Sequence, residues 1–141
     1  MRSRRVLRLL WKGHRFWWRV SGGRLGTRVA GLPVAELITI GRRSGEPRSV
    51  LVNYIDHPNG YVVIASNAGS PTPPAWWLNL ETTPRAEVMR KGRRERVTPR
   101  VLEGDERELA WTAAVAANAD YATYAEVAGR PIPVVLLQRS G

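Results

Sequence analysis

The sequence predicts an α+β protein built around a mainly antiparallel, six-stranded sheet that closes into a small barrel. Six runs of strand-forming residues follow one another through short links, whereas helical segments are inserted late in the chain. The length of 141 residues and the hydrophobic content of 43% suit a single packed core. The six runs are Val34–Ile40, Ser49–Asp56, Tyr61–Ser66, Arg85–Arg90, Glu95–Leu102 and Val134–Gln138.

Local signals place turns and flanking helices around these runs. Asn59-Gly60 predicts a hairpin turn, because both residue types tolerate positive φ. Ala75–Leu80 favours a short helix. Asp105 and Glu108 have the spacing of a capping box, which would open an alanine-rich helix that ends near Ala119.

Positive charge is concentrated in the first third of the chain. The net charge is +10, and residues 1–48 carry all of this excess, with Glu36 and Glu46 as their only acids. Such a field favours an anionic partner: a phosphate, an acidic lipid or a nucleic acid. The absence of cysteine excludes disulfides, thiolate nucleophiles and cysteine metal sites. Because His14 and His57 lack carboxylate-rich neighbours, we expect no metal site.

Residues 4–20 predict an amphipathic helix. At about 100° per residue, its Arg and Lys side chains gather in one arc, opposite Trp, Leu, Val and Phe. Two interpretations stay open: its apolar face packs on the domain, or the helix lies on an anionic membrane surface. The predicted division is this helix, residues 1–21, and a barrel domain, residues 22–141.

We expect a cytoplasmic protein. Charged residues interrupt every apolar stretch, so none reaches the length of about 18 residues that would span a bilayer. The residues after Ser3-Arg4-Arg5 lack the uncharged stretch and the cleavage site of an export signal. If the helix over residues 4–20 binds lipid, the protein is attached peripherally to the inner face of the cell membrane.

A basic loop, residues 41–48, joins the first two predicted strands. Its glycines let backbone N–H groups approach an anion closely. Its arginines present forked donors that match phosphate or carboxylate oxygens, and its serine adds a hydroxyl donor. The pattern favours an anion site formed by Arg42, Arg43, Ser44 and Arg48, and the alternative is a solvated basic loop.

Two later segments carry further candidate residues. The turn at 65–70 can bring backbone close to a ligand, and Trp76, in the following helix, offers a flat apolar surface to a ring system. Tyr121 and Tyr124 are three residues apart, so their hydroxyls would project from one face of a helical turn. Such hydroxyls can bind a carbonyl oxygen and donate a proton to a reduced product. The alternative for all three aromatic residues is ordinary packing.

Four motifs occur in a familiar order. They are the basic loop 41–48, the strand end and turn at 63–69, the helix at 74–80 and the Arg-Pro-Ile-Pro-Val segment at 130–134. Through this ordered set, the chain resembles the deazaflavin-dependent nitroreductase family from about residue 22 to residue 135. The resemblance implies a flavin-reductase-like split β-barrel that binds the deazaflavin coenzyme F420.

The resemblance also implies a role for each candidate residue. In the family, the basic loop holds the phosphate and acidic tail of F420. The turn lies along the deazaflavin ring with a tryptophan beside it, and late tyrosines face the substrate. The implied cofactor-binding residues are Arg42, Arg43, Ser44, Arg48, Ala65, Ser66, Asn67, Gly69 and Trp76, and the implied catalytic residues are Tyr121 and Tyr124.

Two positions depart from the family pattern. Asn67 stands where many relatives carry a lysine, which removes one positive charge near the cofactor. Asn118 stands where some nitro-reducing members have another tyrosine. The second departure weakens the case for a nitro compound as the substrate.

The expected function is hydride transfer between reduced F420 and a small organic substrate such as a quinone, an enone or a nitro compound. One alternative is an oxidoreductase that uses FMN or FAD on the same barrel. Another is a carrier that binds F420 or a different planar ligand without catalysis. No nucleic-acid partner is expected, because residues 49–141 have no net positive charge. The sequence carries no signal for an oligomeric state.

Overall fold

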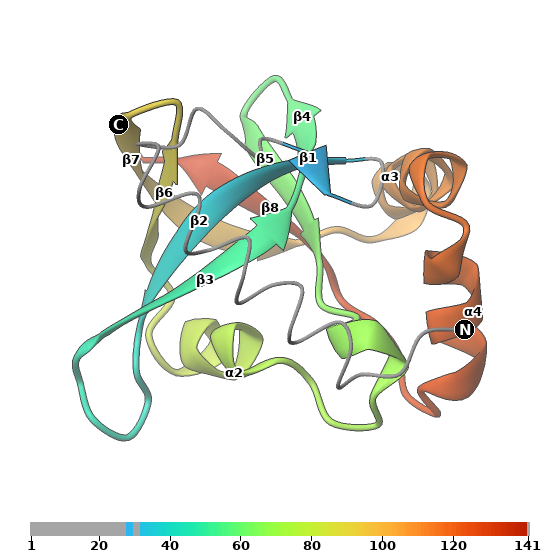
Figure 1. Ribbon diagram of the computed structural model, residues 1–141, viewed down its shortest axis with the longest axis horizontal. Helices are drawn as coiled ribbons and strands as arrows, with labels where there is room; N and C mark the ends of the chain where they lie inside the picture. Colours follow the sequence, from blue (N-terminus) through green and yellow to red (C-terminus); the bar gives the residue numbers. More distant parts are fainter. Residues whose placement is uncertain (1–27, 30–31, 141) are drawn as a thin grey trace.

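The computed structural model describes residues 28–29 and 32–140, and it has the predicted α+β architecture (Figure 1). An antiparallel sheet curls into a barrel, with helix α2 (Ala75–Thr82) at one end and helices α3 (Gly104–Ala117) and α4 (Asp120–Val127) at its side. The predicted helix over residues 4–20 and the boundary at residue 21 lie outside the described residues. The strands are β1 (Arg28–Val29), β2 (Leu32–Ile40), β3 (Pro47–Asn53), β4 (Ile55–His57), β5 (Gly60–Ile64), β6 (Ala86–Arg90), β7 (Arg93–Val101) and β8 (Val134–Arg139).

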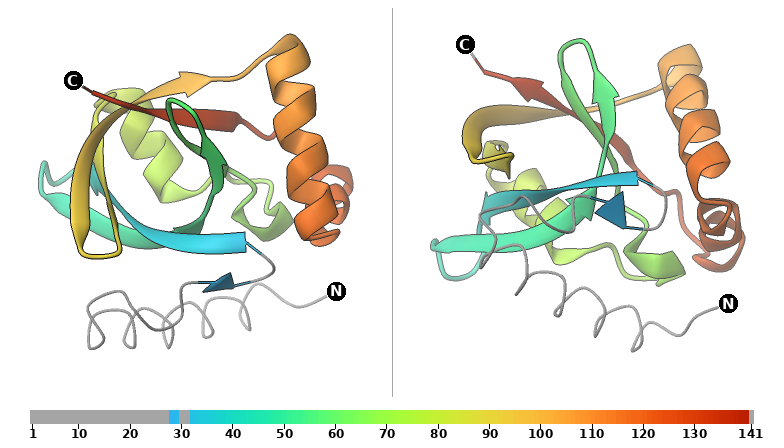
Figure 2. Two further views of the ribbon diagram at one scale, coloured as in Figure 1. Left: turned by 90° about the horizontal axis from the view of Figure 1, so that it is seen from above. Right: turned by 45° about the horizontal axis from the view of Figure 1, so that its top comes forward.

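The sheet closes through a bend at Tyr54. The sequence predicts a single strand over Ser49–Asp56, but β3 pairs with β2 whereas β4 pairs with β5, so the chain changes partners between them. The Tyr54 amide donates a hydrogen bond of 3.0 Å to the Pro33 carbonyl at this point. The remaining neighbours run in the order β2–β6–β7–β8–β5, so the seven strands β2 to β8 form one curled antiparallel sheet (Figure 2).

Alternating side chains of the strands fill the barrel. In β2, Ala35 and Leu37 belong to the inner core, and in β8 Val135 and Leu137 do so. Helix α2 adds Trp76 and Leu80 to the same core, so it closes the barrel interior at one end. The inner core consists of Ala35, Leu37, Val52, Tyr54, Tyr61, Val63, Ala65, Trp76, Leu80, Ala86, Val88, Val97, Val135 and Leu137.

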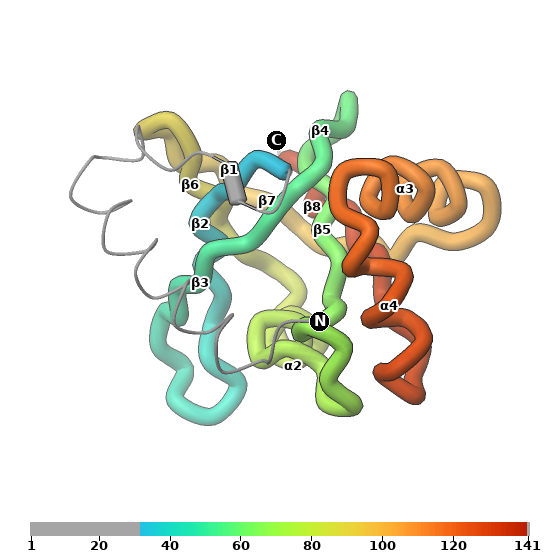
Figure 3. The backbone as a smooth tube through the Cα atoms, turned by 45° about the vertical axis from the view of Figure 1, so that its right-hand side comes forward, coloured from blue at the N-terminus to red at the C-terminus, as the bar shows by residue number. Residues whose placement is uncertain are grey.

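Helices α3 and α4 cover the outer face of β5 and β8 (Figure 3). The outward-facing Val62 of β5 and Leu136 of β8 pack with Trp111 of α3. Tyr121 and Tyr124 of α4 pack with Ile132, which precedes β8. This second layer fixes α4 beside the turn that follows β5. None of the helices in the described part of the chain is long and apolar enough to cross a membrane.

The predicted capping box is wrong. Helix α3 begins at Gly104 with Glu103 at its N-cap, two residues before the predicted N-cap Asp105, and Glu103 makes no side-chain capping bond. Asp105 and Glu106 lie in the first turn instead, where negative charge is favourable beside the unpaired N–H groups. The alanine-rich helix ends at Ala117, and α4 starts anew at Asp120.

The hairpin at Asn59-Gly60 forms, but for a different reason from the one predicted. Asn59 does not have a positive φ, and Gly60 is nearly extended with a φ of 158°. A Cβ atom on Gly60 would lie 1.9 Å from the carbonyl oxygen of Leu137. Glycine is therefore required here by the close approach of β8.

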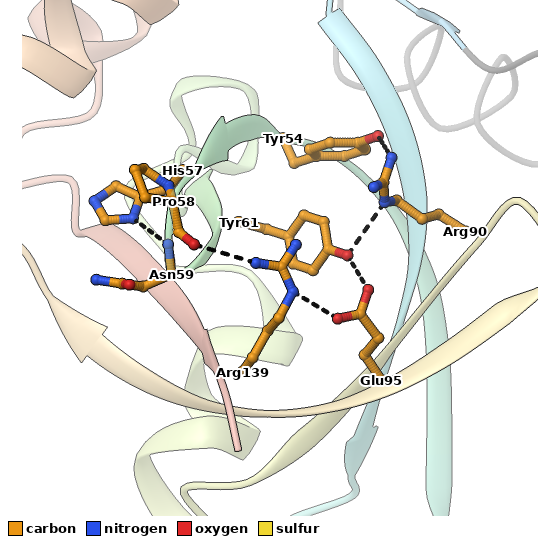
Figure 4. Close-up of polar contacts among 8 residues, drawn as sticks. All are labelled: Tyr54, His57, Pro58, Asn59, Tyr61, Arg90, Glu95 and Arg139. Carbon is orange, nitrogen blue, oxygen red and sulfur yellow. Dashed lines mark hydrogen bonds and ion pairs between the residues drawn. The ribbon is translucent and has the colours of Figure 1, made fainter. Parts of the chain in front are cut away.

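A polar network closes the barrel end away from α2 (Figure 4). Arg90 donates hydrogen bonds of 3.1 Å to the hydroxyls of both Tyr54 and Tyr61. The Tyr61 hydroxyl donates to Glu95, which also accepts a bond of 2.7 Å from Arg139. The Tyr61 bond, reinforced by Arg139, lowers the pKa of Glu95 below its usual value. The cations at this end of the barrel are thus held by a carboxylate and two phenols.

Candidate cofactor-binding cleft

A cleft of about 740 Å³ opens at the barrel end that α2 covers. Cofactor and ligand sites commonly have volumes of about 300–1,000 Å³. Most of its lining comes from the basic loop, strand β3, the turn after β5 and helix α2, and Tyr121 of α4 adds to it. Of the predicted site residues, the lining includes Arg42, Arg43, Ser44, Arg48, Ser66, Asn67, Trp76 and Tyr121.

Two glycines allow the basic loop to form a tight corner. The Gly41 amide donates to the Glu46 carbonyl and the Gly45 amide to the Gly41 carbonyl, both at 2.8 Å. Gly45 has a φ of 73°, which side-chain-bearing residues rarely adopt. A Cβ atom on Gly41 would lie 2.6 Å from the Ser44 hydroxyl and 3.2 Å from the Arg48 side chain. Glycine at position 41 therefore lets Arg48 fold back over the corner.

Asn79 ties the loop to helix α2. Its side-chain oxygen accepts bonds of 3.1 and 3.2 Å from the backbone amide and the guanidinium group of Arg42. Its side-chain nitrogen donates to the hydroxyl of Thr39, at the end of β2, at 3.0 Å. Asn79 is only 4% exposed, and Thr39 is buried as well. Sequence reasoning missed both residues, although a polar residue three positions after Trp76, on the same face of α2, was a usable signal.

The charges of the loop are free of acidic partners. Arg42, Arg43 and Arg48 are exposed, and none of them takes part in an ion pair among residues 32–140. Among the described residues, Arg42 bonds to the neutral side-chain amide of Asn79. An anion placed at this corner would therefore meet three guanidinium groups that no carboxylate of the described part of the chain neutralises.

Apolar side chains also line the cleft. Val50, Val52 and Ile64 line it together with Trp76. Trp76 is 8% exposed and packs edge-on against Trp77, with ring centroids 6.5 Å apart. It is a core residue that also borders the cleft, so the packing interpretation is confirmed and its contact with a cofactor ring stays a prediction. Together these side chains suit a planar, apolar ring.

The turn after β5 lies partly in the cleft. Ser66 and Asn67 line the cleft, whereas Ala65 is fully buried behind them. Gly69 faces α4, because a Cβ atom there would lie 2.8 Å from Val127 and 3.2 Å from the Cα atom of Tyr124. The structure therefore does not bring Ala65 and Gly69 into the lining, and their contact with a cofactor stays a prediction.

The two tyrosines of α4 are placed differently. Tyr121 lines the cleft and is 6% exposed, whereas Tyr124 is buried outside the lining. Their rings meet edge to face, with centroids 6.0 Å apart. Burial, with a smaller contribution from Tyr124, raises the pKa of Tyr121 well above its usual value. The Tyr121 hydroxyl therefore keeps its proton at neutral pH and can act as a donor at the cleft.

Comparisons with known proteins agree with this geometry. Residues 11–139 match the model of the F420H(2)-dependent quinone reductase family. An F420H(2)-dependent quinone reductase of Mycobacterium tuberculosis is 32% identical over 126 residues, covering 86% of this chain and 85% of the relative.

Two solved structures are similar as well. One, described as an F420-H2 dependent reductase, is 34% identical and has a TM-score of 0.67, covering 75% of this chain and 94% of that chain. Another, described as a domain-swapped dimer, is 31% identical and has a TM-score of 0.70, covering 91% of this chain and 97% of that chain. The resemblance to a deazaflavin-dependent family is thus confirmed, and F420 is favoured over FMN and FAD. The chain belongs to the F420H(2)-dependent quinone reductase family of oxidoreductases, whose cofactor is coenzyme F420.

Proposed function

We propose that this oxidoreductase binds F420H2 in the cleft and reduces a quinone there. The observation that carries the proposal is that three arginines of one loop and several apolar side chains line the same cleft. F420 has matching parts: a phosphate with an acidic glutamate tail, and a planar tricyclic ring with apolar faces. A quinone shares the planar, apolar character of that ring.

The residues present fit the cofactor. Arg42, Arg43 and Arg48 offer charge-assisted bonds to the phosphate and tail, and Ser44 adds a hydroxyl. Asn79 holds Arg42 in place, so less conformational freedom is lost on binding. The ring would then lie against the apolar side chains beside Trp76. The cofactor supplies the hydride when bound, and the protein supplies orientation and electrostatics.

Tyr121 is the proposed proton donor. Reduction of a quinone to a hydroquinone takes up a hydride and a proton. The phenol of Tyr121 borders the cleft, so it can hydrogen-bond a quinone oxygen and donate a proton to it as negative charge develops. Because its pKa is raised, it is a weaker acid than an ordinary tyrosine, so the transfer depends on the negative charge that builds up on that oxygen. Solvent then returns the proton to the phenol. Tyr124 has a supporting part, because its ring packs against that of Tyr121.

A cofactor titration followed by a turnover assay tests the proposal. The purified protein is titrated with F420, FMN and FAD under the same conditions, with fluorescence or calorimetry as the readout. F420 is expected to bind at concentrations where neither flavin does. F420H2 oxidation is then followed with a soluble quinone, an enone and a nitroaromatic compound. Absence of F420 binding would reject the cofactor site, and turnover of only the enone or the nitro compound would reject the quinone.

A further inference from the structure

The Arg130 side chain donates hydrogen bonds to four backbone carbonyl oxygens in and near the turn at 65–70. Its Nε donates to the carbonyl oxygen of Ser70 at 3.0 Å. Its Nη2 donates to the carbonyl oxygens of Ala65 and Ser66, both at 3.1 Å, and its Nη1 to that of Pro131 at 3.3 Å. One guanidinium group therefore spans both ends of the turn at 65–70.

The local sequence explains how the side chain reaches this place. Gly129, just beyond α4, has a φ of 67°, so the chain reverses direction in the manner of a helix C-terminus. Pro131 disfavours helical backbone at Arg130, which keeps the next residues extended. The Ala65 amide donates to the Pro133 carbonyl at 3.0 Å, which fixes the segment beside the turn. Arg130 is thus held against the turn from both sides.

The turn that Arg130 spans has a strained backbone. Asn67, Ala68 and Gly69 have φ values of 47°, 54° and 81°. Non-glycine residues at positive φ persist only where surrounding contacts hold them. Within the turn, the Gly69 amide bonds to Ser66 and the Ser70 amide to Asn67, both at 3.0 Å. The guanidinium group supplies the bonds that join the two ends of this turn across the strained residues.

Arg130 also keeps its positive charge next to the turn that borders the cleft. Among the described residues it forms no ion pair, and its bonds go to neutral carbonyl oxygens. Burial lowers its pKa without bringing it near neutrality, so the group stays a cation. Ser66, Asn67 and Ala68, which it supports, line the cleft. The turn is therefore a part of the cleft surface whose shape is set before a ligand binds, and the positive charge of Arg130 lies next to it.

We propose that Arg130 is a positioning residue that shapes the turn at 65–70 into the surface on which the cofactor ring rests. The proposal rests on the proposed function for the identity of the ring. The shape of the turn is independent of that identity and can be tested without any cofactor.

The first test is hydrogen exchange in the unliganded protein. In Arg130→Ala, amides of residues 65–72 are expected to exchange about tenfold faster or more, whereas those of β2 and β8 keep their protection. Added methylguanidinium should restore slow exchange. Arg93→Ala, which removes an exposed arginine far from the turn, is the control and should leave exchange unchanged. Unchanged exchange at 65–72 in Arg130→Ala overturns the proposal.

The second test is F420 affinity. Arg130→Ala is expected to weaken F420 binding about tenfold, with partial recovery in methylguanidinium, while the midpoint of thermal unfolding of the barrel changes little. Should Arg130→Ala fail to fold, Arg130→Lys replaces it, because a lysine keeps the charge but cannot span several carbonyls. Wild-type exchange in Arg130→Lys overturns the proposal. Absence of F420 binding by the wild type rejects the proposed function alone, since the exchange result stands by itself.

Discussion

The two ends of the barrel use arginine in opposite ways. At the end shown in Figure 4, Arg90 and Arg139 bond to Glu95, Tyr54 and Tyr61, and their guanidinium groups lie over the tyrosine rings. At the cleft end, arginine bonds go to neutral oxygens, those of Asn79 and of backbone carbonyls. At the first end Glu95 pairs with Arg139 and two phenols accept the bonds of Arg90, whereas the cleft-end arginines have no carboxylate partner among the described residues and keep their charge for a ligand.

The groups around a guanidinium group, and not the residue type, therefore distinguish an arginine that stabilises the fold from one that can bind an anion. Where a carboxylate and phenols surround the guanidinium group, breaking the network costs stability. Where only amides and carbonyls do so, the cation is positioned but not neutralised, and an incoming anion gains most of the interaction. Four changes test this contrast, in order of decreasing expected effect.

The cleft-end charges should matter mainly for binding. Arg42→Ala together with Arg48→Ala removes two charge-assisted contacts worth about 1.5–3 kcal/mol each, so F420 affinity should fall by about two to four orders of magnitude. Fluorescence titration measures the loss. Arg93→Ala with Arg96→Ala, on the exposed strand β7, is the matched control for net charge. Equal F420 affinity in the two double variants would place the phosphate elsewhere.

A tyrosine of the cleft end should likewise affect turnover, whereas a tyrosine of the other end should affect stability. Tyr121→Phe, and the double change with Tyr124→Phe, should lower kcat for quinone reduction by about 100-fold, the low end for loss of a general acid. Tyr124→Phe alone should stay near the wild-type rate, because Tyr124 does not line the cleft. Steady-state kinetics separates kcat from KM. Retained turnover with unchanged KM in the double variant would remove both tyrosines from the mechanism.

Loss of the Tyr61 hydroxyl, at the barrel end away from the cleft, should lower stability without changing cofactor affinity. Tyr61 is 1% exposed, and its hydroxyl joins Arg90 to Glu95. Tyr61→Phe leaves two charged groups short of a partner and should lower the free energy of unfolding by about 1–3 kcal/mol. Chemical denaturation measures this change. F420 affinity should stay at the wild-type value, and a parallel loss of affinity would show that the two ends are coupled.

The smallest expected effect is a pH dependence of stability from Glu95. Its pKa is lowered in the folded state, so its contribution is present above the unfolded value near 4.3 and is lost as pH falls through the folded value. Thermal unfolding of the wild type between pH 3 and pH 6 should therefore show a decline on acidification that Glu95→Gln reduces. The same decline in both proteins would mean that other carboxylates, such as Glu106, dominate.

Much of the fold was predictable because strand signals are local. Five of the six predicted strands correspond to β2, β5, β6, β7 and β8 with shifts of one or two residues at their ends. The sixth split into β3 and β4, since the exchange of partners at Tyr54 depends on where β2 and β5 lie. The capping box at Asp105 failed because the helix already starts at Gly104, just after the Leu102 amide bonds to the Val134 carbonyl of β8.

The sequence by itself determined the chemistry of the site: glycines and arginines adjacent in one loop, a tryptophan at the start of α2, and an order of motifs that indicates a deazaflavin-dependent oxidoreductase. Which groups those arginines contact depends on how the barrel folds. Asn79 reaches Arg42 across 37 positions, and Arg130 reaches Ala65 across 65. Residue spacing encodes contacts within a turn or along a strand, whereas contacts at such separations exist only once the barrel has closed.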